Sequence, residues 1–343
     1  MAGVIQHILP KFLLKGFAGR IEGKEKYFWV YRSDGKIFES NIKNTSVGRY
    51  FYGRERELSV DDDITTFENE YAAFLDELRA HQGKLEISDH RVPNLIAHIV
   101  TRTKHLRDSL RNSAEFIAER VNKYFSNSAN ANVAISKKIN GEYKNRLINN
   151  RIPRYLRRNS QRLLKRKLPD FLNSYKNDME KIRKSFFAEL ETEIPKIAKT
   201  AHIKGLSQGL IPEARVEDYQ RLQWAVCNTY GTLILGDIGC LFDTASKKRF
   251  KSITFADDKI LNIFLPISDQ QILVGTSFSE IPQIDHNIIN KETAKCSREY
   301  FICSKRSKII ESLIDLLGTE ADIISEEELD QFEKKLFMKY GVN

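Results

Sequence analysis

A run of positively charged residues between Lys144 and Lys167 constrains this chain more than any other sequence feature. Ten lysines and arginines occur there, and no aspartate or glutamate separates them. Apolar residues recur through the same run at helical spacing, although Pro153 and the pair Asn159-Ser160 interrupt the pattern. The spacing predicts an amphipathic helical segment with one strongly basic face. Such a density of one charge requires a partner that neutralises it.

The positive charge is a regional property of the middle of the chain. Residues 101–185 contain 22 basic and 7 acidic residues, a net charge of +15, whereas the whole chain carries +9 and the remainder therefore −6. The partner that we expect is DNA or RNA, and binding should weaken steeply with salt as counterions are released. The expected phosphate-binding residues are Arg151, Arg154, Arg157, Arg158, Arg162, Lys165, Arg166 and Lys167.

Other interpretations of this basic segment remain open. It can pair with the acidic remainder of the chain or with an acidic partner protein. Attachment to a membrane surface is disfavoured, because the apolar stripe lacks Trp and Phe at its centre. Phe125 and Tyr155 would add base stacking if the nucleic acid is single-stranded.

Length and composition favour a folded cytoplasmic protein. A chain of 343 residues with 41% hydrophobic residues is long enough for one large domain or two ordinary ones. The first ten residues lack the basic and apolar regions of a signal peptide, and no uncharged apolar run approaches the roughly 20 residues of a spanning helix. The four cysteines form no Cys-x-x-Cys pair, so we expect buried, reduced thiols instead of a zinc site or disulfides.

Local patterns divide the chain into three zones. Residues 1–60 combine a short helix over 11–18 with an aromatic hairpin whose strands are 27–31 and 37–42. Residues 61–206 are helical. A first amphipathic helix begins at Asp61, and a second is expected to run from about Asp89 through Thr103 towards Phe125.

The third zone, residues 207–343, changes to short β-rich runs followed by helices. Four runs are expected to form strands of one sheet, at 224–226, 232–235, 260–265 and 272–274. Helices are expected at 288–301, at 305–317 and after a cap at Ser325. The predicted fold is α+β, with a small N-terminal hairpin, a C-terminal antiparallel or mixed sheet, and a large helical, basic middle region.

The first eighteen residues carry the spaced pattern H-x-x-P-x-x-x-L-x-x-F, formed by His7, Pro10, Leu14 and Phe17. This pattern resembles the opening of the domain of unknown function family 4238, a largely bacterial group. Later segments resemble the family in the same order, among them the aromatic pair Phe51-Tyr52. The resemblance implies an architecture and brings no activity with it.

Three further residues stand where the family has recognisable features. Glu68 resembles its helical acid, and Arg102 resembles the Arg-Thr that closes its second long helix. Asp237 occupies the place of the Asp in the family's Ser-Asp-Asn-Pro. Here Ile238 and Gly239 replace the Asn and Pro, so the turn after Asp237 need not keep the family's geometry.

His7, Glu68, Arg102 and Asp237 are the candidate catalytic residues, and we expect them to meet in one pocket. A carboxylate at the end of a strand or a neutral imidazole can act as a general base. Each residue also has a structural alternative. Asp237 can accept N–H bonds within its own turn, His7 can bond a carbonyl, and Glu68 can pair with Arg102.

A nuclease interpretation has a second possible basis. Arg91 and His98 lie seven positions apart, which resembles the Arg-x(4 to 6)-His pair of the higher eukaryotes and prokaryotes nucleotide-binding family of RNases. Motifs of P-loop, dinucleotide-binding, zinc-peptidase and α/β-hydrolase enzymes are absent. The acids Asp237, Asp243, Asp257 and Asp258 lack the spacing of a metal-nuclease core, and the sequence assigns no metal or cofactor.

Together these features favour a nucleic-acid-acting protein, in its specific form a nuclease-like effector of a bacterial defence or toxin system. The alternative is a non-catalytic module that binds nucleic acid or another protein. In that case the four candidate residues are structural.

Overall fold

The computed structural model describes residues 4–53, 60–81, 83–127, 130–133, 136, 138, 142, 162–163, 166–168, 170, 173–174, 176–208, 213–254, 258–322, 330–331 and 334. Its contacts form two compact units. We call Met1–Ser109 with Lys199–Ile323 the α+β unit, and Leu110–Ala198 with Ile324–Asn343 the helical unit. The units divide the chain differently from the three sequence zones. Strand β13 (Tyr300–Cys303) of the third zone pairs with β3 (Glu25–Arg32) of the first zone, so parts of both zones belong to one unit.

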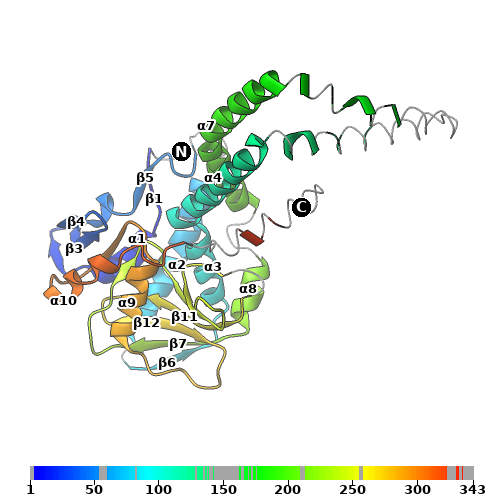
Figure 1. The fold of residues 1–343 in the computed structure, drawn as a ribbon. Helices are drawn as coiled ribbons and strands as arrows, with labels where there is room; N and C mark the ends of the chain where they lie inside the picture. The colour runs from blue at the N-terminus through cyan, green and yellow to red at the C-terminus, as the bar shows by residue number, and fades with distance from the viewer. Residues whose placement is uncertain are drawn as a thin grey trace. The chain divides into compact units, whose positions relative to one another are not determined.

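The predicted α+β class is confirmed, and the larger sheet of the described residues has six strands (Figure 1). Every described pair in it is antiparallel. The strand order is β10 (Phe250–Lys251), β9 (Leu241–Thr244), β11 (Ile260–Pro266), β12 (Gln271–Thr276), β7 (Gln223–Asn228) and β6 (Leu85–Ile87).

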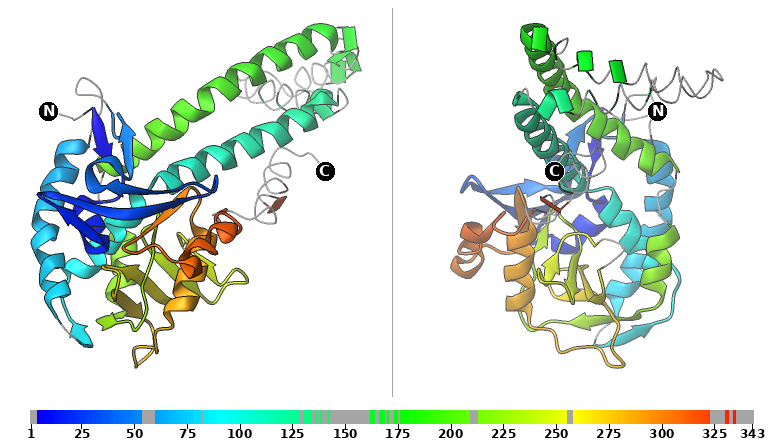
Figure 2. Two further views of the ribbon diagram at one scale, coloured as in Figure 1. Left: turned by 90° about the vertical axis from the view of Figure 1, so that its left-hand side faces the viewer. Right: turned by 45° about the vertical axis from the view of Figure 1, so that its right-hand side comes forward.

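Alternating side chains let this sheet bury both of its faces. Ile263 and Leu265 of β11 join the core formed with α1 (Lys11–Leu14), α2 (Asp61–Ala80) and α3 (Arg91–Thr101). Phe264 points to the other face and packs in a cluster with Ile289 of α9 (His286–Cys296). The right-hand view of Figure 2 accordingly shows the strands between α9, in orange, and the cyan helices.

A second sheet joins the N-terminal hairpin to later parts of the chain. Its order is β2 (Arg20–Glu22), β3, β13 and β8 (Leu235–Gly236), and β4 (Ile37–Asn41) pairs with the other side of β3. The predicted hairpin is therefore confirmed as β3 and β4. Across the β3–β13 pair, the rings of Tyr31 and Phe301 stack with centroids 4.9 Å apart.

This second sheet corrects two predictions for the third zone. The run 232–235 does not share a sheet with the other three, because its strand, β8, pairs with β13. The helix predicted over 288–301 ends at Cys296, because the apolar residues that follow form β13 against β3. The helix predicted at 305–317 is two short pieces, α10 (Lys308–Glu311) and η3 (Ile314–Leu316), and the cap at Ser325 lies outside the described residues.

The helix beginning at Asp61 is confirmed as α2, whereas the second long helix is broken. Helix α3 ends at Thr101 and α4 (Lys104–Ser126) begins three residues later. Thr103 starts α4 by accepting the N–H of Leu106 at its Oγ1, 3.2 Å away. The helix predicted over 11–18 is α1 followed by η1 (Lys15–Phe17).

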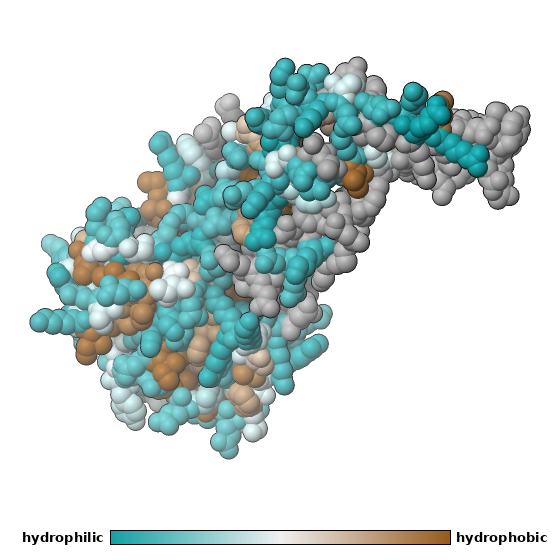
Figure 3. Space-filling model, in the orientation of Figure 1, coloured by the Kyte–Doolittle hydropathy of each residue, from teal (hydrophilic) through white to brown (hydrophobic). Residues whose placement is uncertain are grey.

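The remaining elements complete both units. A two-stranded ribbon of β1 (Ile5–His7) and β5 (Val47–Arg49), the short η2 (Ile42–Asn44) and α8 (Glu213–Gln220) belong to the α+β unit. The helical unit contains the parts of α4 and α7 (Lys176–Gln208) between Leu110 and Ala198. Its coloured side chains are mostly hydrophilic on the face shown in Figure 3. All four cysteines are free, and three are buried, as predicted.

Candidate functional site

Three of the four candidate residues meet at the guanidinium of Arg102, which is 1% exposed. Its Nη2 donates to the main-chain oxygen of His7 at 2.5 Å, and its Nε donates to the hydroxyl of Tyr52 at 3.0 Å. Its Nη1 forms an ion pair with Glu68 of α2 and lies 3.1 Å from Nε2 of His98. The Glu68–Arg102 pair that the sequence offered is confirmed. Through these contacts Arg102 links β1 to α2 and α3.

His7 is anchored by its imidazole as well as by its carbonyl group. Its Nε2 lies 3.0 Å from the carbonyl oxygen of Ile42, which is the structural alternative that the sequence left open. Burial lowers the pKa of His7, so the ring is neutral and donates through Nε2. Both polar ends of this residue therefore hold the N-terminal segment in place.

The Arg91 and His98 pair is divided between two environments. Arg91 pairs with Asp89 at 2.6 Å and lies over the ring of Phe74. His98 is fully buried, with its ring stacked on that of Phe67 at a centroid distance of 3.9 Å. A ring enclosed in this way is closed to a nucleic-acid backbone, so the structure gives the RNase-like pair no support.

Asp237 follows β8 and contacts a different part of the chain. Its Oδ1 accepts the N–H of Arg298 at 3.1 Å, and its Oδ2 accepts the N–H of Glu299 at 2.7 Å. The structural alternative that the sequence offered had Asp237 accept main-chain N–H bonds within its own turn. That prediction was wrong, because pairing of β8 with β13 brings residues 298–300 beside the carboxylate.

Glycine shapes the turn that presents Asp237. Gly239 has a φ of +72°, and its N–H donates to the carbonyl of Gly236 at 3.1 Å. A Cβ at Gly239 would also come within 2.5 Å of a methyl carbon of Ile99. Both the left-handed backbone and the close approach require glycine at the position where the family pattern has proline.

The pKa of Asp237 lies close to neutral pH. Burial raises the pKa of Asp237 to about 6, although the N–H groups of Glu299 and Arg298 act in the opposite direction. The negative charge of Glu299 adds to the increase. A carboxyl group of this pKa can give up and take back a proton near pH 6 to 7, as a general acid or base requires.

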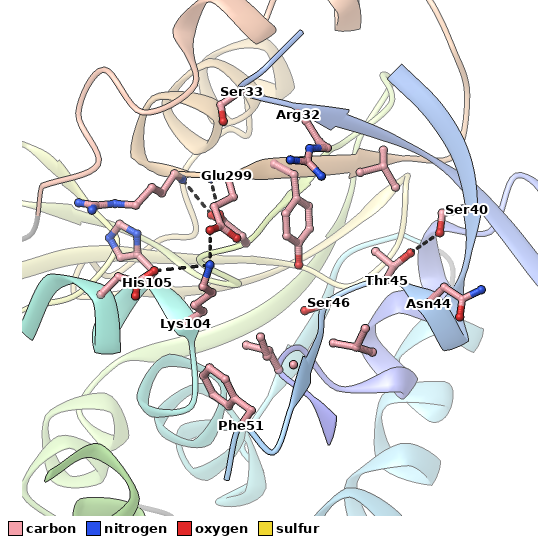
Figure 4. Close-up of a pocket in the computed structure, with 18 of the residues that line it drawn as sticks. Arg32, Ser33, Ser40, Asn44, Thr45, Ser46, Phe51, Lys104, His105 and Glu299 are labelled. Carbon is pink, nitrogen blue, oxygen red and sulfur yellow. Dashed lines mark hydrogen bonds and ion pairs between the residues drawn. The ribbon is translucent and has the colours of Figure 1, made fainter. Parts of the chain in front are cut away.

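Asp237 lines a cavity of about 430 Å³ within the α+β unit (Figure 4). The lining residues come from β3, β4, η2, β5, the start of α4 and the segment 298–300. Small-molecule sites typically enclose about 300–1,000 Å³. His7, Glu68 and Arg102 do not line this cavity, so the four candidate residues are divided between the cavity and the Arg102 cluster.

One side of the cavity is charged. Lys104, at the start of α4, forms an ion pair with Glu299, and its Nζ lies 3.7 Å from Asp108. His105 lies beside them in Figure 4, and burial, followed by the charge of Arg298, lowers its pKa to about 3. Its Nε2 is 2.9 Å from the hydroxyl of Ser252. Of His105 and Asp237, only Asp237 has a pKa near neutrality.

The opposite side is neutral and polar, and its hydroxyl and amide side chains are Ser40, Asn44, Thr45 and Ser46. Thr45 donates to the hydroxyl of Ser40 at 2.8 Å. Ser46 has a φ of +54°, which is uncommon for a residue with a side chain. Its Oγ accepts the N–H of Leu9 at 2.9 Å, so this unusual backbone is fixed beside the cavity.

Sequence reasoning missed the residues that accompany Asp237. Lys104 and Glu299 carry no motif, and only the fold brings them together. Ser46 does lie shortly before the aromatic pair Phe51-Tyr52, which the family resemblance includes. Apart from that, only the polar pair Asn44-Thr45 before it gave a local signal.

The predicted phosphate-binding residues fall mostly beyond the described part of the chain. Arg162, Arg166 and Lys167 have helical backbones and are exposed. The other five, Arg151, Arg154, Arg157, Arg158 and Lys165, lie outside the described residues. Their role as a binding surface remains a prediction from the charge pattern.

The described residues provide neither a cluster of metal ligands nor a helix that could span a membrane. No group of three or more His, Cys, Asp or Glu side chains is placed there to hold a metal ion. Nor does any helix in that part of the chain combine the length and apolar character needed to cross a membrane.

The fold and cavity define an α+β protein built on two antiparallel sheets, with a buried carboxyl group in a polar cavity. The family described as protein of unknown function (DUF4238) matches residues 5–306, and the chain belongs to this family. The match confirms the resemblance first indicated by the N-terminal pattern. No curated protein and no solved structure gives a match.

Proposed function

We propose that this protein acts on nucleic acid, as a nuclease-like effector of a bacterial defence or toxin system, with the Asp237 cavity as its catalytic site. One observation carries the proposal. Residues 101–185 have a net charge of +15, and ten cations follow one another between Lys144 and Lys167 without an acid. A polyanion such as DNA or RNA is the ligand that neutralises this pattern most directly.

The cavity supports the catalytic part of the proposal. Asp237 has a pKa of about 6, so much of it is a carboxylate near pH 7 and can accept a proton from a nucleophile. Arg32, Lys104 and Arg298 line the same cavity and can stabilise negative charge on a phosphate, although each pairs with a carboxylate in the structure. A base and three cations in one cavity are suited to phosphodiester chemistry.

A second candidate is a non-catalytic module that binds nucleic acid or an acidic protein. The Arg102 cluster favours it, because three of the four candidate residues make contacts that hold the fold together. Asp237 also accepts two main-chain N–H bonds and so contributes to the structure.

Salt-dependent binding tests the proposal. We expect full-length chain to bind labelled DNA or RNA, with affinity falling on the order of a thousandfold between about 50 and 200 mM salt if about six to eight cations meet phosphates. Replacing Arg154, Arg157 and Arg158 by Ala should weaken binding and reduce the salt dependence. Fluorescence anisotropy with single- and double-stranded oligonucleotides measures both effects.

A matched triple variant controls for loss of charge. Arg20, Arg221 and Arg306 are exposed arginines of the α+β unit, and their replacement by Ala should leave the salt dependence unchanged. Failure to bind DNA or RNA, single- or double-stranded, at low salt would contradict the proposal. Salt-sensitive binding without cleavage would favour the non-catalytic module.

A further inference from the structure

The cavity offers a ligand two different walls. Lys104 and Arg298 form the charged wall with Asp108, Asp237 and Glu299, and Arg32 is a third cation of the lining. The neutral wall opposite is formed by Ser40, Asn44, Thr45 and Ser46, which Figure 4 labels. A ligand that satisfies both walls has an anionic group at one end and hydroxyl or amide groups at the other. A nucleotide unit has this division between its phosphate and its sugar and base.

The charged wall can open to an anion. Lys104 and Glu299 are paired, but their side chains are 41% and 46% exposed, and exposed ion pairs are weak. A phosphate entering the cavity can therefore replace the Glu299 carboxylate as the partner of Lys104. The Glu299 side chain is then free to turn towards solvent, whereas its N–H stays bonded to Asp237.

The neutral wall suits a sugar and a base. Hydroxyl and amide groups both donate and accept hydrogen bonds, as ribose hydroxyls and base edges require. Phe38 of β4 also lines the cavity and is 41% exposed. An aromatic ring available at the wall of a nucleotide-sized cavity can stack on a base.

We propose that the cavity accepts one ribonucleotide unit of an RNA strand, with the phosphate at Lys104 and the 2′-hydroxyl at Asp237. This inference rests on the proposed function and names RNA as its substrate. The Asp237 carboxylate takes the proton of the 2′-hydroxyl, and the 2′ oxygen forms a bond to phosphorus while the bond from phosphorus to the 5′ oxygen breaks. The leaving oxygen takes a proton from water. The products are a 2′,3′-cyclic phosphate and a 5′-hydroxyl.

Substrates that lack the nucleophile test this step without altering the protein. Full-length chain is incubated with one labelled sequence as single-stranded RNA, as DNA and as 2′-O-methyl RNA, and binding and cleavage are both measured. We expect binding of all three, cleavage of RNA alone, and a 2′,3′-cyclic phosphate at the new end. Cleavage of DNA or 2′-O-methyl RNA at the same rate would overturn the inference and leave the proposed function standing.

Two other outcomes are equally decisive. Binding of all three strands without cleavage of RNA would overturn the inference and favour a binding module. Absence of binding to any strand would overturn the proposed function as well. These results are distinguishable because binding and cleavage are recorded in the same samples.

Charge variants test the phosphate position independently of Asp237. Glu299→Gln removes the nearer of the two carboxylates that pair with Lys104 and should tighten RNA binding, whereas Lys104→Gln should weaken it by about tenfold. Glu25→Gln and Lys43→Gln alter an ion pair that does not line the cavity, and should have no effect on binding. Equal weakening by Glu299→Gln and Lys104→Gln would overturn the assignment of the phosphate to Lys104.

Discussion

At the scale of the residue, Asp237 has a structural role and is the proposed catalytic base. Its carboxylate accepts two main-chain N–H bonds, yet burial still leaves its pKa near 6. The family resemblance and the position of a carboxylate after an apolar run together selected Asp237 from the sequence. The sequence could not predict its partners, because Arg298 and Glu299 come from a distant segment that only strand pairing brings near.

The raised pKa of Asp237 predicts a pH-dependent part of the stability. Folding raises this pKa from about 3.8 to about 6, so the native state holds the proton more tightly than the unfolded chain. The resulting stabilisation is present below about pH 3.8 and is lost as the pH rises through about 6. It amounts to about 3 kcal/mol.

Urea denaturation of the wild type and of Asp237→Asn measures this contribution. The free energy of unfolding of the wild type minus that of the variant should fall by about 2.4 kcal/mol between pH 4 and 7, because the first part of the loss already occurs below pH 4. Taking the difference removes the titration of all other groups. A difference that stays constant across this range would show that the Asp237 pKa is not raised.

At the scale of the element, the break between α3 and α4 is the main departure from the sequence prediction. The apolar spacing continued across it and therefore favoured one long helix. The break lets Arg102 turn inward to Glu68, Tyr52 and the carbonyl of His7. A buried cation at this point fixes where three segments meet.

Loss of this cation should destabilise the protein strongly. Arg102→Met leaves Glu68 and the His7 carbonyl without their partner, and breaking a buried pair in this way costs about 3–5 kcal/mol. Arg20 also contacts two carboxylates, Glu22 and Glu39, but on the surface, so Arg20→Met should change stability little. Chemical denaturation of both variants measures the contrast. Equal losses would mean that the Arg102 cluster does not hold the fold.

The short strands show where local patterns stop being informative. Helix α2 could be predicted from its sequence, because its apolar face repeats through twenty residues. Strand β8 has two residues and β13 has four, so neither carries a period of its own. Strand β13 depends on pairing with β3, and β8 depends on pairing with β13; neither pairing is visible in one segment alone.

At the scale of the whole molecule, the sequence was sufficient for the α+β class and the basic middle region. It was not sufficient to predict how the chain divides into two units, because the β3–β13 pair joins segments far apart in the chain. The cavity depends on the same closure, since Lys104 and Glu299 become neighbours only in the folded chain. The family match, over residues 5–306, spans nearly all of the elements involved.

The most direct test is the rate at which the full-length chain cleaves labelled single-stranded RNA between pH 5 and 8, with binding measured in parallel. Because the carboxylate form of Asp237 is the proposed base, the rate should rise about tenfold per pH unit below about pH 6 and level off above it. Asp237→Asn should bind RNA as tightly as the wild type and cleave it about a hundredfold or more slowly. Cleavage by Asp237→Asn at the wild-type rate would show that Asp237 is not the catalytic residue.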